Sequence, residues 1–394
     1  MKFTYLLIIW MVSMSYSLIA EDINPGFIQT LHQEAIIFDA HADTPLDLID
    51  EAIDFGKWRK TGHVDLMKME MGGVDVQVFA LFIAPRYQAD RAIQRVYDLM
   101  RASEEALKPY SNRIELCSKM SDIERCLKND KKVIIYGIEG GHFITDNLDI
   151  IDTMYNRGVR YITLTWTNTN AWADAAGDSA RWGGLNAFGE KVVERMNDLG
   201  ILLDLSHVSD DTFWDALKIT RAPALVSHSC CRALCEHERN LTDEMLKALA
   251  KNGGVIGINF YPGFLDEDFK NKSVIVDSII DAQLDSMKQF HAVESEEYKA
   301  FKRETYYKYH QTLPKLSIER LIDHIDHAVR IAGIDHVGLG SDFDGIGSVP
   351  EGLEHQGKLI IITEKLLQRG YGPEEIKKIL GGNMMRLFKT VLKH

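Results

Sequence analysis

Histidine and carboxylate residues stand directly after apolar runs at several places in this chain of 394 residues. The stretch "FDAHADTP" (38–45) places His41 and Asp43 two residues apart, at the end of the apolar run from Ala35 to Phe38. Side chains alternate between the two faces of a strand, so these two would point the same way. They could bind one metal ion or form an ordinary hydrogen-bonded pair, and the stretch alone does not decide between the two.

A second pair of the same kind, His63 and Asp65, has a different context. In "GHVDLMKMEMGG" the aspartate precedes a helix-like stretch that contains the apolar residues Leu66, Met67, Met69 and Met71. An aspartate immediately before a helix is typical of an N-cap, whose side chain accepts a hydrogen bond from the first turn. No strand-like run delivers this pair into a pocket, so we interpret it as structural.

Further potential ligands end other apolar runs. They are Glu139, His207, His228 and Asp342, and with His41 and Asp43 they come from five different run ends. A lone histidine at a strand end is more often structural, but three histidines and three carboxylates together favour zinc or a similar divalent ion. Five ligands and a spare acid exceed what one tetrahedral ion needs, so the pattern predicts two metal ions bridged by a carboxylate.

A scaffold must bring these distant run ends together. Eight strand-like runs alternate with helix-like stretches: "AIIFDAHAD", "VDVQVFALF", "KVIIYGIEGG", "VRYITLTWT", "ILLDLSHVS", "PALVSHS", "GGVIGINF" and "DHVGLGSDFDG". This alternation predicts one α/β domain over residues 21–394, folded as a (β/α)8 TIM-like barrel with its active site at the carboxyl ends of the strands. Segment 187–199 has the apolar face of an amphipathic helix. A charged segment from Pro262 to Leu316 follows the seventh run and is expected to add helices outside the barrel or over its mouth.

The first twenty residues indicate export. "MKFTYLLIIWMVSMSYSLIA" combines one lysine, an apolar stretch and small residues, which is typical of a signal peptide cleaved after Ala20 or, as a second choice, after Ser17. Serines interrupt the stretch, which falls short of the ~20 apolar residues that a membrane span needs. We therefore expect removal of residues 1–20, a periplasmic or secreted protein, and no membrane span in the mature chain.

The net charge of the chain limits the classes of binding partner. Removal of Lys2 with the signal peptide changes the formal net charge from −13 to −14, which disfavours nucleic acid and anionic membranes as partners.

Five cysteines are too few for a disulfide scaffold, although Cys117 and Cys126 could pair in an oxidising compartment. The remaining cysteines form a cluster of three, Cys230, Cys231 and Cys235. A zinc site in this cluster is less favoured, because adjacent cysteines rarely both reach one ion. The oligomeric state is open, with a homodimer as one alternative.

Six motifs occur in order along the whole mature chain: "FDAHAD", "GIEGGH", "LDLSHVS", "VSHS", "ERN" and "GSDFDG". Together they resemble the membrane (renal) dipeptidase family of binuclear zinc peptidases, a specific combination although each motif alone is weak. The resemblance implies that one zinc ion is held by His41, Asp43 and Glu139, and that Glu139 bridges to a second ion held by His207 and His228. It also implies that Arg239 binds the substrate carboxylate and that Asp342 transfers protons.

Trp166 departs from the family pattern. Many members have a histidine after "LT" that helps to polarise the scissile carbonyl, whereas this chain reads "TLTWTNTNAWAD". An indole N–H donates one hydrogen bond but cannot become cationic. Asn168 or Asn170 could supply the missing donor. The departure therefore concerns substrate preference and rate, and it leaves the metal centre intact.

Other polar residues near the motifs have plainer interpretations. Asp39 shares strand parity with His41 and Asp43, so it could orient a ligand from behind or be a buried structural acid. Asp204 has the same parity as His207 and could also act on a ligand from behind. His142 is interpreted as a loop residue that follows two glycines, which would let the backbone approach the metals. Asp344 is the second choice for the acid/base role.

The sequence therefore predicts an exported zinc-dependent dipeptidase with Glu139 and Asp342 as catalytic residues. A metal-bridging hydroxide, formed from water whose pKa two cations lower to roughly 7, would attack the scissile carbonyl. Zinc and Trp166 or an asparagine would stabilise the oxyanion, and Asp342 would transfer the proton. A D-residue at the C-terminal position of the substrate is left open.

Two alternatives stand beside this prediction. One is another binuclear-metal barrel hydrolase that acts on a lactone, a phosphoester or a cyclic amide with the same ions. The other is a secreted peptide-binding barrel whose catalysis lapsed when the histidine was replaced by Trp166. The presence of every inferred metal ligand disfavours the second alternative.

Overall fold

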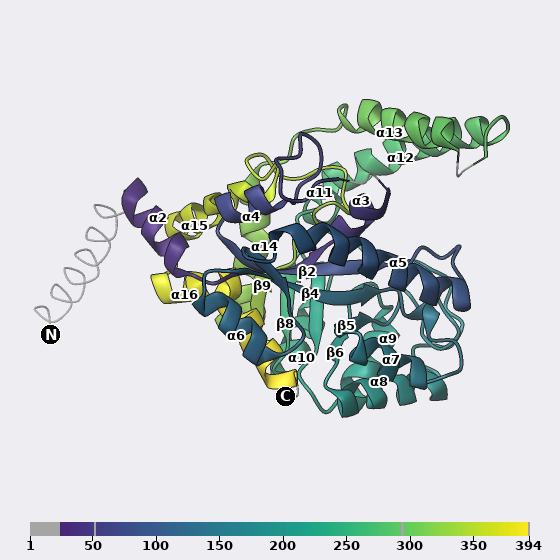
Figure 1. The fold of residues 1–394 in the computed structure, drawn as a ribbon, viewed down its shortest axis with the longest axis horizontal. Helices are drawn as coiled ribbons and strands as arrows, with labels where there is room; N and C mark the ends of the chain where they lie inside the picture. Colours follow the sequence, from purple (N-terminus) through teal and green to yellow (C-terminus); the bar gives the residue numbers. More distant parts are fainter. Residues whose placement is uncertain (1–23, 51–52, 293–294, 393–394) are drawn as a thin grey trace, which may run out of the picture.

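The computed structural model describes residues 24–50, 53–292 and 295–392, and the predicted signal peptide lies outside these residues. Its centre is a closed barrel of eight parallel strands in the order β2-β1-β9-β8-β7-β6-β5-β4, which closes where β2 pairs with β4. The strands are β1 (Ile37–Ala42), β2 (Val74–Phe82), β4 (Lys132–Glu139), β5 (Val159–Thr163), β6 (Leu202–Asp204), β7 (Leu225–Ser229), β8 (Val255–Ile258) and β9 (Val337–Leu339). Each lies within one of the eight predicted runs, so the predicted (β/α)8 barrel is confirmed (Figure 1).

The continuous apolar character of the runs follows from the cover on both faces of the sheet. All six residues of β1 are buried, and so are seven of the eight residues of β4. Side chains fill a parallel barrel from the inside and helices cover it from the outside, so its strands need no alternation of polar and apolar residues.

Helices surround the barrel (Figure 1). They are α2 (Pro25–Glu34), α3 (Thr44–Asp50), α4 (Leu66–Met71), α5 (Asp90–Leu107), α6 (Met120–Lys128), α7 (Asp149–Asn156), α8 (Ala187–Leu199), α9 (Asp210–Ile219), α10 (Asp243–Asn252), α14 (Ile318–Ala332), α15 (Ile360–Gln368), α16 (Pro373–Lys377) and α17 (Asn383–Val391). In the part of the chain that the structure describes, no helix combines the length and the apolar character that crossing a bilayer requires.

Helix α8 shows how local sequence sets an element. The side chain of Asn186 caps its first turn by accepting hydrogen bonds from the backbone N–H groups of Phe188 and Gly189. Val192 and Met196 lie on its buried face, and the helix ends at Gly200, whose φ of 80° suits glycine. The predicted amphipathic helix over 187–199 is therefore confirmed.

One short strand was not predicted. β3 (Ile114–Leu116) pairs with residues 132–134 of β4, before β5 begins its own pairing at Tyr136. Three residues make too short an apolar run to be recognised in the sequence, and only the neighbouring edge of β4 makes this segment a strand.

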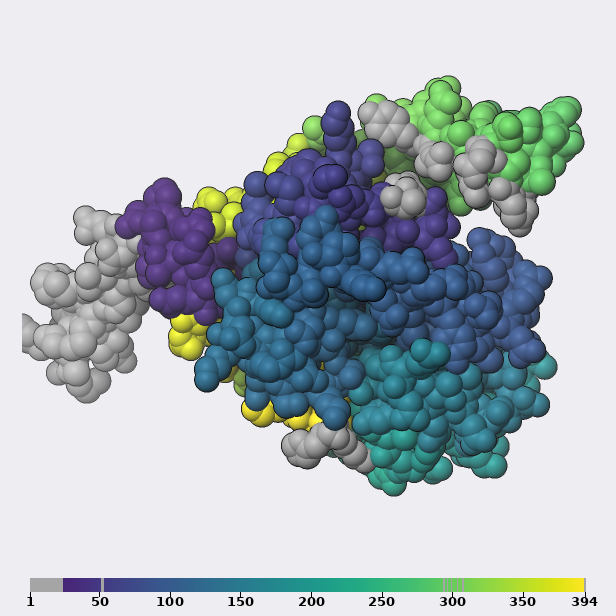
Figure 2. All heavy atoms as spheres, viewed as in Figure 1, coloured from purple at the N-terminus to yellow at the C-terminus, as the bar shows by residue number. Residues whose placement is uncertain are grey.

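The charged segment after β8 forms three helices, α11 (Pro262–Leu265), α12 (Glu267–Lys288) and α13 (Glu296–His310). Helices α12 and α13 pack against each other around a small core of Ile280, Leu284 and Tyr298. They project from the barrel as an arm, at the upper right of Figures 1 and 2. The predicted helical insertion is therefore present, and this arm lies outside the barrel.

A buried histidine of α14 ties the insertion to the barrel. His324 Nδ1 accepts a hydrogen bond from the backbone N–H of Cys231 at 3.1 Å, and its Nε2–H donates to the carbonyl of Leu265 at 2.9 Å. Burial lowers the pKa of His324 to about 4. The ring is therefore neutral in the folded protein at neutral pH, as these two hydrogen bonds require.

Candidate metal centre

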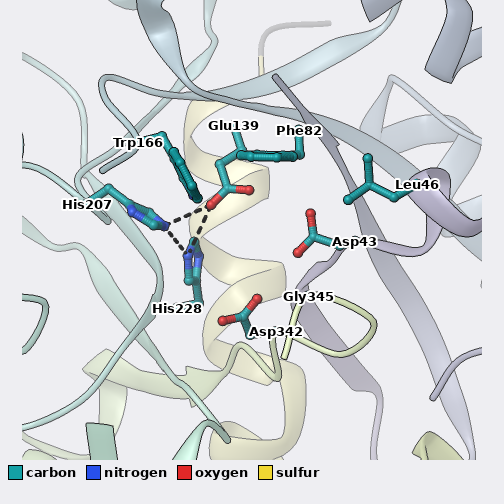
Figure 3. A pocket seen from close by; sticks show the side chains of 9 residues that line it. All are labelled: Asp43, Leu46, Phe82, Glu139, Trp166, His207, His228, Asp342 and Gly345. Atoms are coloured by element: carbon teal, nitrogen blue, oxygen red, sulfur yellow. Dashed lines mark hydrogen bonds and ion pairs between the residues drawn. The ribbon is translucent and has the colours of Figure 1, made fainter. Parts of the chain in front are cut away.

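The predicted ligands and the predicted acid converge at the carboxyl ends of the barrel strands. His41 and His228 lie in β1 and β7, Glu139 ends β4, and three residues follow strand ends closely: Asp43 after β1, His207 after β6 and Asp342 after β9. A cavity of about 140 Å³ opens there (Figure 3). It is lined by Asp43, Leu46, Phe82, Glu139, Trp166, His207, His228, Asp342 and Gly345, while His41 is fully buried.

Glu139 lies between two groups of ring nitrogens. Its Oε1 is 2.8 Å from His207 Nε2 and 3.5 Å from His228 Nε2, whereas its Oε2 is 3.6 Å from His41 Nε2. His41 Nε2 is in turn 3.5 Å from Asp43 Oδ2. The two oxygens of one carboxylate therefore face different histidines, which is the arrangement that bridging between two cations requires.

The spacing of these atoms fits a divalent metal centre. Two ligands of one tetrahedral zinc ion lie about 3.3 Å apart when the bonds are 2.0–2.1 Å long, and the contacts around Glu139 span 2.8–3.6 Å. Two groups each bring three ligand atoms within 4.8 Å of one another: His41 with Glu139 and His228, and His41 with Asp43 and Asp342. Because His41 belongs to both groups, the structure brings the ligands together without assigning each one to a particular ion.

Unpaired ring nitrogens support the same conclusion. Among the described residues, His41 Nε2 and His207 Nδ1 are buried without a hydrogen-bond partner. The Nε2 atoms of His207 and His228 face each other at 2.9 Å. Two such nitrogens need a hydrogen or a cation between them, and a divalent cation would also satisfy the neighbouring carboxylate oxygens.

Burial keeps two of the histidines neutral. It lowers the pKa of His207 to about 4, with a further contribution from the positive charge of Arg239. It also holds the pKa of His228 well below the ordinary value, assisted by the charge of His41. A neutral imidazole offers a ring nitrogen lone pair to a metal ion, so this is the form that binding requires.

The carboxylate side of the cavity concentrates negative charge. Burial, together with the nearby charge of Glu139, raises the pKa of Asp43 to about 8. Burial alone would raise the pKa of Glu139, but the charge of His41 and a hydrogen bond from His207 hold it well below its ordinary value. Burial would lower the pKa of His41, yet Glu139 and Asp43 raise it well above the ordinary value. This side of the cavity therefore favours a bound cation.

Two site residues have a backbone conformation that residues other than glycine rarely adopt. His207 has a φ of 68° and Asp342 a φ of 62°, both in the left-handed region. Such conformations cost about 1–3 kcal/mol each and are typical of functional sites. Here the turns after β6 and β9 place both side chains on the wall of the cavity (Figure 3).

Neighbouring groups hold Asp342 in position. Asn259 Nδ2 donates a hydrogen bond to Asp342 Oδ2 at 2.9 Å. Gly345 lies so close that a Cβ on it would be 2.6 Å from Asp342 Oδ1 and 2.2 Å from Asp43 Oδ2. Burial raises the pKa of Asp342 to about 6. This carboxyl group can therefore exchange a proton near neutral pH, as a general acid–base group must.

Asp344, the second choice for that role, does not line the cavity. It accepts a hydrogen bond from Thr44 Oγ1 at 2.7 Å and lies 3.5 Å from Arg59 Nη1. Its own backbone N–H donates to His63 Nδ1 at 2.9 Å. Asp65 caps the next helix by accepting from Lys68 N at 2.8 Å. The pair at 63 and 65 is therefore structural, as interpreted from the sequence, and it supports the loop that carries Asp342.

Arg239 is buried near the site but does not line the cavity. Its Nη2 donates to the carbonyl oxygen of His228 at 3.3 Å, and its guanidinium carbon is 5.3 Å from the ring centroid of Phe264. Among the described residues its Nε has no hydrogen-bond partner, and no carboxylate lies within 4.0 Å of its guanidinium. A buried cation without a carboxylate partner is well suited to bind an anionic ligand.

Trp166 and Phe82 form an apolar wall of the cavity. Their rings make an edge-to-face contact with centroids 4.9 Å apart, and Leu46 also lines the cavity (Figure 3). Neither Phe82 nor Leu46 was identified from the sequence. Phe82 ends the second predicted run, and its position at the same end as the ligands was the one available signal.

The two asparagines proposed as substitute donors lie elsewhere. Asn168 does not line the cavity. The Asn170 amide is used by its own loop: Nδ2 donates to Leu164 O, and Oδ1 accepts from the backbone N–H groups of Trp172 and Ala173, each at 2.9 Å. Asn170 is therefore a loop-forming residue and not a donor to substrate, because its hydrogen-bonding groups already serve the backbone.

The glycines before His142 serve packing. A Cβ on Gly141 would lie 2.4 Å from the backbone oxygen of Leu164, so the end of β4 approaches the loop after β5 at that point. This close approach is to the loop after β5, and an approach of the backbone to the metal ions stays a prediction. His142 lies in a short 3-10 helix, η2 (Gly141–Phe143), where it is buried and does not line the cavity.

The buried acids behind the ligands have specific partners. Asp39 accepts hydrogen bonds from Ser341 N and Ser341 Oγ at 2.8 and 2.6 Å, so it joins β1 to the loop after β9. Asp204 contacts Ser227, the residue before His228, and does not contact the ring of His207. Asp204 is therefore buried behind the ligands, as strand parity suggested, and it lies next to the residue that contacts His228.

Two groups that contact histidine ligands were missed from the sequence. Tyr161 Oη lies 2.9 Å from His41 Nδ1, and Ser227 Oγ lies 2.8 Å from His228 Nδ1. Ser227 directly precedes a predicted ligand, which was a weak signal. Tyr161 lies on β5, 120 residues from His41, and only closure of the barrel brings them together.

The cysteines form no cluster that could hold a shared ion at 230–235. Their sulfur atoms point to different carbonyl groups: Cys230 to Asn259, Cys231 to His324 and Cys235 to Gly263. The sulfur atoms of Cys117 and Cys126 are buried and 3.6 Å apart, without a disulfide. Their pairing in an oxidising compartment stays a prediction.

Comparisons with known proteins agree with this geometry. Residues 26–394 match the model of the membrane dipeptidase family, peptidase family M19. Over 344 residues the chain is 33% identical to an uncharacterized dipeptidase of Schizosaccharomyces pombe, a match that covers 84% of this chain and 72% of that protein. The crystal structure of the probable dipeptidase PvdM from Pseudomonas aeruginosa has a TM-score of 0.80 at 27% identity and covers 93% of this chain and 98% of that one.

A more distant solved structure shares the fold. It is a metallopeptidase from Rhodobacter sphaeroides liganded with a phosphinate mimic of the dipeptide L-Ala-D-Ala, with a TM-score of 0.74 at 24% identity. The match covers 91% of this chain and all of that one, 100%. The resemblance found in the sequence motifs is therefore confirmed: this chain belongs to the membrane dipeptidase family, peptidase family M19, and is a metallopeptidase.

Proposed function

We propose that this chain is an exported, zinc-dependent dipeptidase that binds two metal ions and hydrolyses free dipeptides. One observation carries the proposal: the two oxygens of Glu139 face separate ring nitrogens, those of His207 and His228 on one side and that of His41 on the other. Imidazole and carboxylate donors favour zinc. Membership of the membrane dipeptidase family supports peptide substrates.

The residues of the chain supply orientation and proton transfer. The metal ions, when bound, supply Lewis acidity that lowers the pKa of water and polarises the scissile carbonyl. The ring nitrogens of His41, His207 and His228 and the carboxylates of Asp43 and Glu139 would hold them. Asp342 accepts a proton from the attacking water and donates it to the leaving amine, since its pKa of about 6 allows both steps.

Arg239 supports selection of dipeptides by length. A guanidinium can hold a carboxylate with two parallel hydrogen bonds. A dipeptide has its carboxylate one residue beyond the scissile carbonyl, whereas a tripeptide has it farther away. Binding of the terminal carboxylate by Arg239 would therefore favour dipeptides over longer peptides. The absence of a carboxylate partner for Arg239 among the described residues supports this role.

Trp166 is proposed to contact the substrate. It lines the cavity and presents an apolar surface together with Phe82, so it suits the side chain of the N-terminal residue of the dipeptide. Asn168 is retained as a weaker candidate for substrate contact, because it lies outside the cavity lining. A D-residue at the C-terminal position stays a prediction, which a dipeptide panel with L,L and L,D forms tests.

The experiment that tests the proposal compares the full chain with Glu139→Gln. We expect about two zinc ions per wild-type chain by elemental analysis, and hydrolysis of dipeptides but not of tripeptides. Glu139→Gln should lose metal and activity together, because a neutral amide cannot bridge two cations as a carboxylate does. Full metal content and full rate in this variant would refute the bridging role.

The same substrates separate the alternatives. Hydrolysis of lactones, phosphoesters or cyclic amides without hydrolysis of dipeptides would favour a different binuclear hydrolase on this barrel. Dipeptide binding without turnover by the zinc-loaded protein would favour the lapsed peptide-binding barrel.

Export is proposed from the N-terminal sequence. The combination of one lysine, an apolar stretch and small residues before Glu21 supports removal of residues 1–20 by a signal peptidase. N-terminal sequencing of the protein from its natural source should begin near Glu21 or Leu18. Cytoplasmic protein that retains Met1 would contradict export.

A further inference from the structure

A hydrogen-bond network beneath the cavity has Asp204 at its centre. The carboxylate is fully buried. Its Oδ1 accepts from the backbone N–H groups of Ser227 and Ser206, at 2.8 and 3.2 Å. Its Oδ2 accepts from the hydroxyl groups of Ser227 and Thr163, at 2.7 and 2.6 Å. All four partners are donors, so this carboxylate acts only as an acceptor.

Ser227 connects this network to a predicted metal ligand. Its Oγ lies 2.8 Å from His228 Nδ1, and Ser227 is itself fully buried. A serine hydroxyl has one hydrogen, and the hydrogen bond of 2.7 Å to Asp204 uses it. Towards His228 the oxygen can then only accept, so Nδ1 must carry the hydrogen of the ring. A neutral imidazole with its hydrogen on Nδ1 has its lone pair on Nε2.

The Nε2 of His228 points to the metal centre. It lies 3.5 Å from Glu139 Oε1 and 2.9 Å from His207 Nε2. The lone pair fixed on Nε2 is therefore directed to the atoms that would surround a metal ion. His207 differs, because its Nδ1 has no hydrogen-bond partner among the described residues. The contact with Ser227 therefore fixes the position of the ring hydrogen in His228. No such contact within the described part of the chain fixes it in His207.

We propose that Asp204 and Ser227 are positioning residues that fix His228 in the tautomer able to bind metal. The inference rests on the proposed metal-binding role of His228. It assigns to Asp204 an effect on metal affinity that passes through a serine hydroxyl, without any contact between Asp204 and a ligand ring.

Replacement of Asp204 by asparagine should reverse the direction of this relay. The backbone N–H groups of Ser206 and Ser227 require an acceptor, so they hold the amide oxygen at the position of Oδ1. The amide NH2 group then takes the position of Oδ2 and donates to Ser227 Oγ. The hydroxyl hydrogen of Ser227 is released and can turn to His228 Nδ1 at 2.8 Å, a shorter contact than that of 3.2 Å to Ser206 Oγ. The ring hydrogen then moves to Nε2, and the lone pair no longer faces the metal.

The test measures zinc bound by the full chain at a series of buffered free zinc concentrations, without peptide. Loss of an outer hydrogen-bond partner typically weakens metal binding about 10–100-fold. We expect Asp204→Asn to weaken one of the two ions about 100-fold and Ser227→Ala about 10-fold, because without the hydroxyl both tautomers of His228 remain accessible. Thr163→Val is the matched control, since it removes a hydrogen bond to the same carboxylate without contact to a histidine ring, and it should retain both ions.

The double variant Asp204→Asn/Ser227→Ala gives the decisive comparison. Without the serine hydroxyl, the asparagine cannot impose the wrong tautomer, so zinc affinity should recover to that of Ser227→Ala alone. A merely structural role of Asp204 predicts the opposite, because the double variant would be at least as weak as Asp204→Asn. Any one of three results would overturn the inference. They are a double variant at least as weak as Asp204→Asn, retention of both ions by Asp204→Asn, and equal weakening of zinc binding in Thr163→Val.

Two controls distinguish a loss of zinc affinity from a loss of folding and from a lack of dipeptidase activity. Far-UV circular dichroism identifies variants that do not fold, and if Asp204→Asn is one of them, Ser227→Ala alone decides, with unchanged affinity as the refuting outcome. Because only zinc is titrated, a protein that shows the expected zinc pattern but hydrolyses no dipeptide would refute the proposed dipeptidase and leave this inference standing. A wild-type chain that binds no zinc would refute both.

Discussion

Removal of Arg239 should affect dipeptides that carry a free carboxylate far more than those that do not. The guanidinium is buried, its side chain makes one direct hydrogen bond, to the carbonyl oxygen of His228, and its Nε has no partner in the described residues. No carboxylate of the described chain lies within 4.0 Å to neutralise it. A substrate carboxylate would therefore supply a partner for a cation that the fold itself leaves without one.

The size of the effect follows from this environment. Truncation of one partner of a buried, hydrogen-bonded charge pair costs about 2–5 kcal/mol. At about 1.36 kcal/mol per tenfold, Arg239→Ala should lower kcat/KM for a free dipeptide by roughly 30- to 5,000-fold. The matching dipeptide amide lacks the carboxylate, so its already low rate should change little, by less than about threefold. Arg239→Lys should recover only part of the loss, because an ammonium group cannot form two parallel hydrogen bonds.

The assay measures kcat/KM for one dipeptide and its amide on wild type, on both Arg239 variants and on Arg221→Ala. Arg221 pairs with Asp198 at 2.6 Å, and both side chains are more than half exposed, where an ion pair contributes little. This control should behave as wild type on both substrates. An equal loss on acid and amide in Arg239→Ala would show that Arg239 supports the fold and does not recognise substrate.

Three further outcomes are expected. Asp342→Asn should keep its metal ions while kcat falls about 10²–10⁴-fold, whereas Asp344→Asn should mainly lower the melting temperature; the reverse pattern would mean that the wrong aspartate was chosen. Trp166→Ala should lower kcat/KM roughly tenfold more for a dipeptide with N-terminal leucine than for one with N-terminal glycine, and equal losses would argue against an apolar substrate contact. The pKa of His324 is lowered from 6.5 to about 4 by burial, so the unfolded state takes up the proton first as the pH falls. The unfolding free energy of zinc-free protein, measured by urea denaturation, should therefore fall by up to about 3 kcal/mol between pH 6.5 and pH 4, and His324→Gln should flatten this decline.

The barrel could be predicted from the sequence because both faces of each strand are covered. This cover makes the strands visible as continuous apolar runs, whatever their neighbours are. The alternation with helices then implies parallel strands whose carboxyl ends share one rim. From this alone, ligands that are far apart in the sequence, such as His41 and His228, could be expected in one cavity. The strand β3 (Ile114–Leu116) escaped prediction because its only support is the edge of β4.

The partners of the polar residues could not be predicted in the same way. Asp342 and Asp344 are two residues apart in one motif, yet one lines the cavity and the other accepts a hydrogen bond from Thr44 behind it. The turn after β9 decides this, since both residues adopt a positive φ that breaks the strand alternation. Asn170 likewise reads as a free donor in the sequence, but its amide is used by the backbone of its own loop.

The sequence by itself determined which residues reach the rim of the barrel, because the period of a strand and the order of the elements are local properties. Only the tertiary structure decided what each of them contacts there. Asp204 shares strand parity with His207, two positions away on its own run, but its side chain accepts a hydrogen bond from Ser227, 23 residues later on the next strand. Hydrogen bonds require donor and acceptor within about 3 Å, and that distance depends on the register between neighbouring strands, which no single run of the sequence contains.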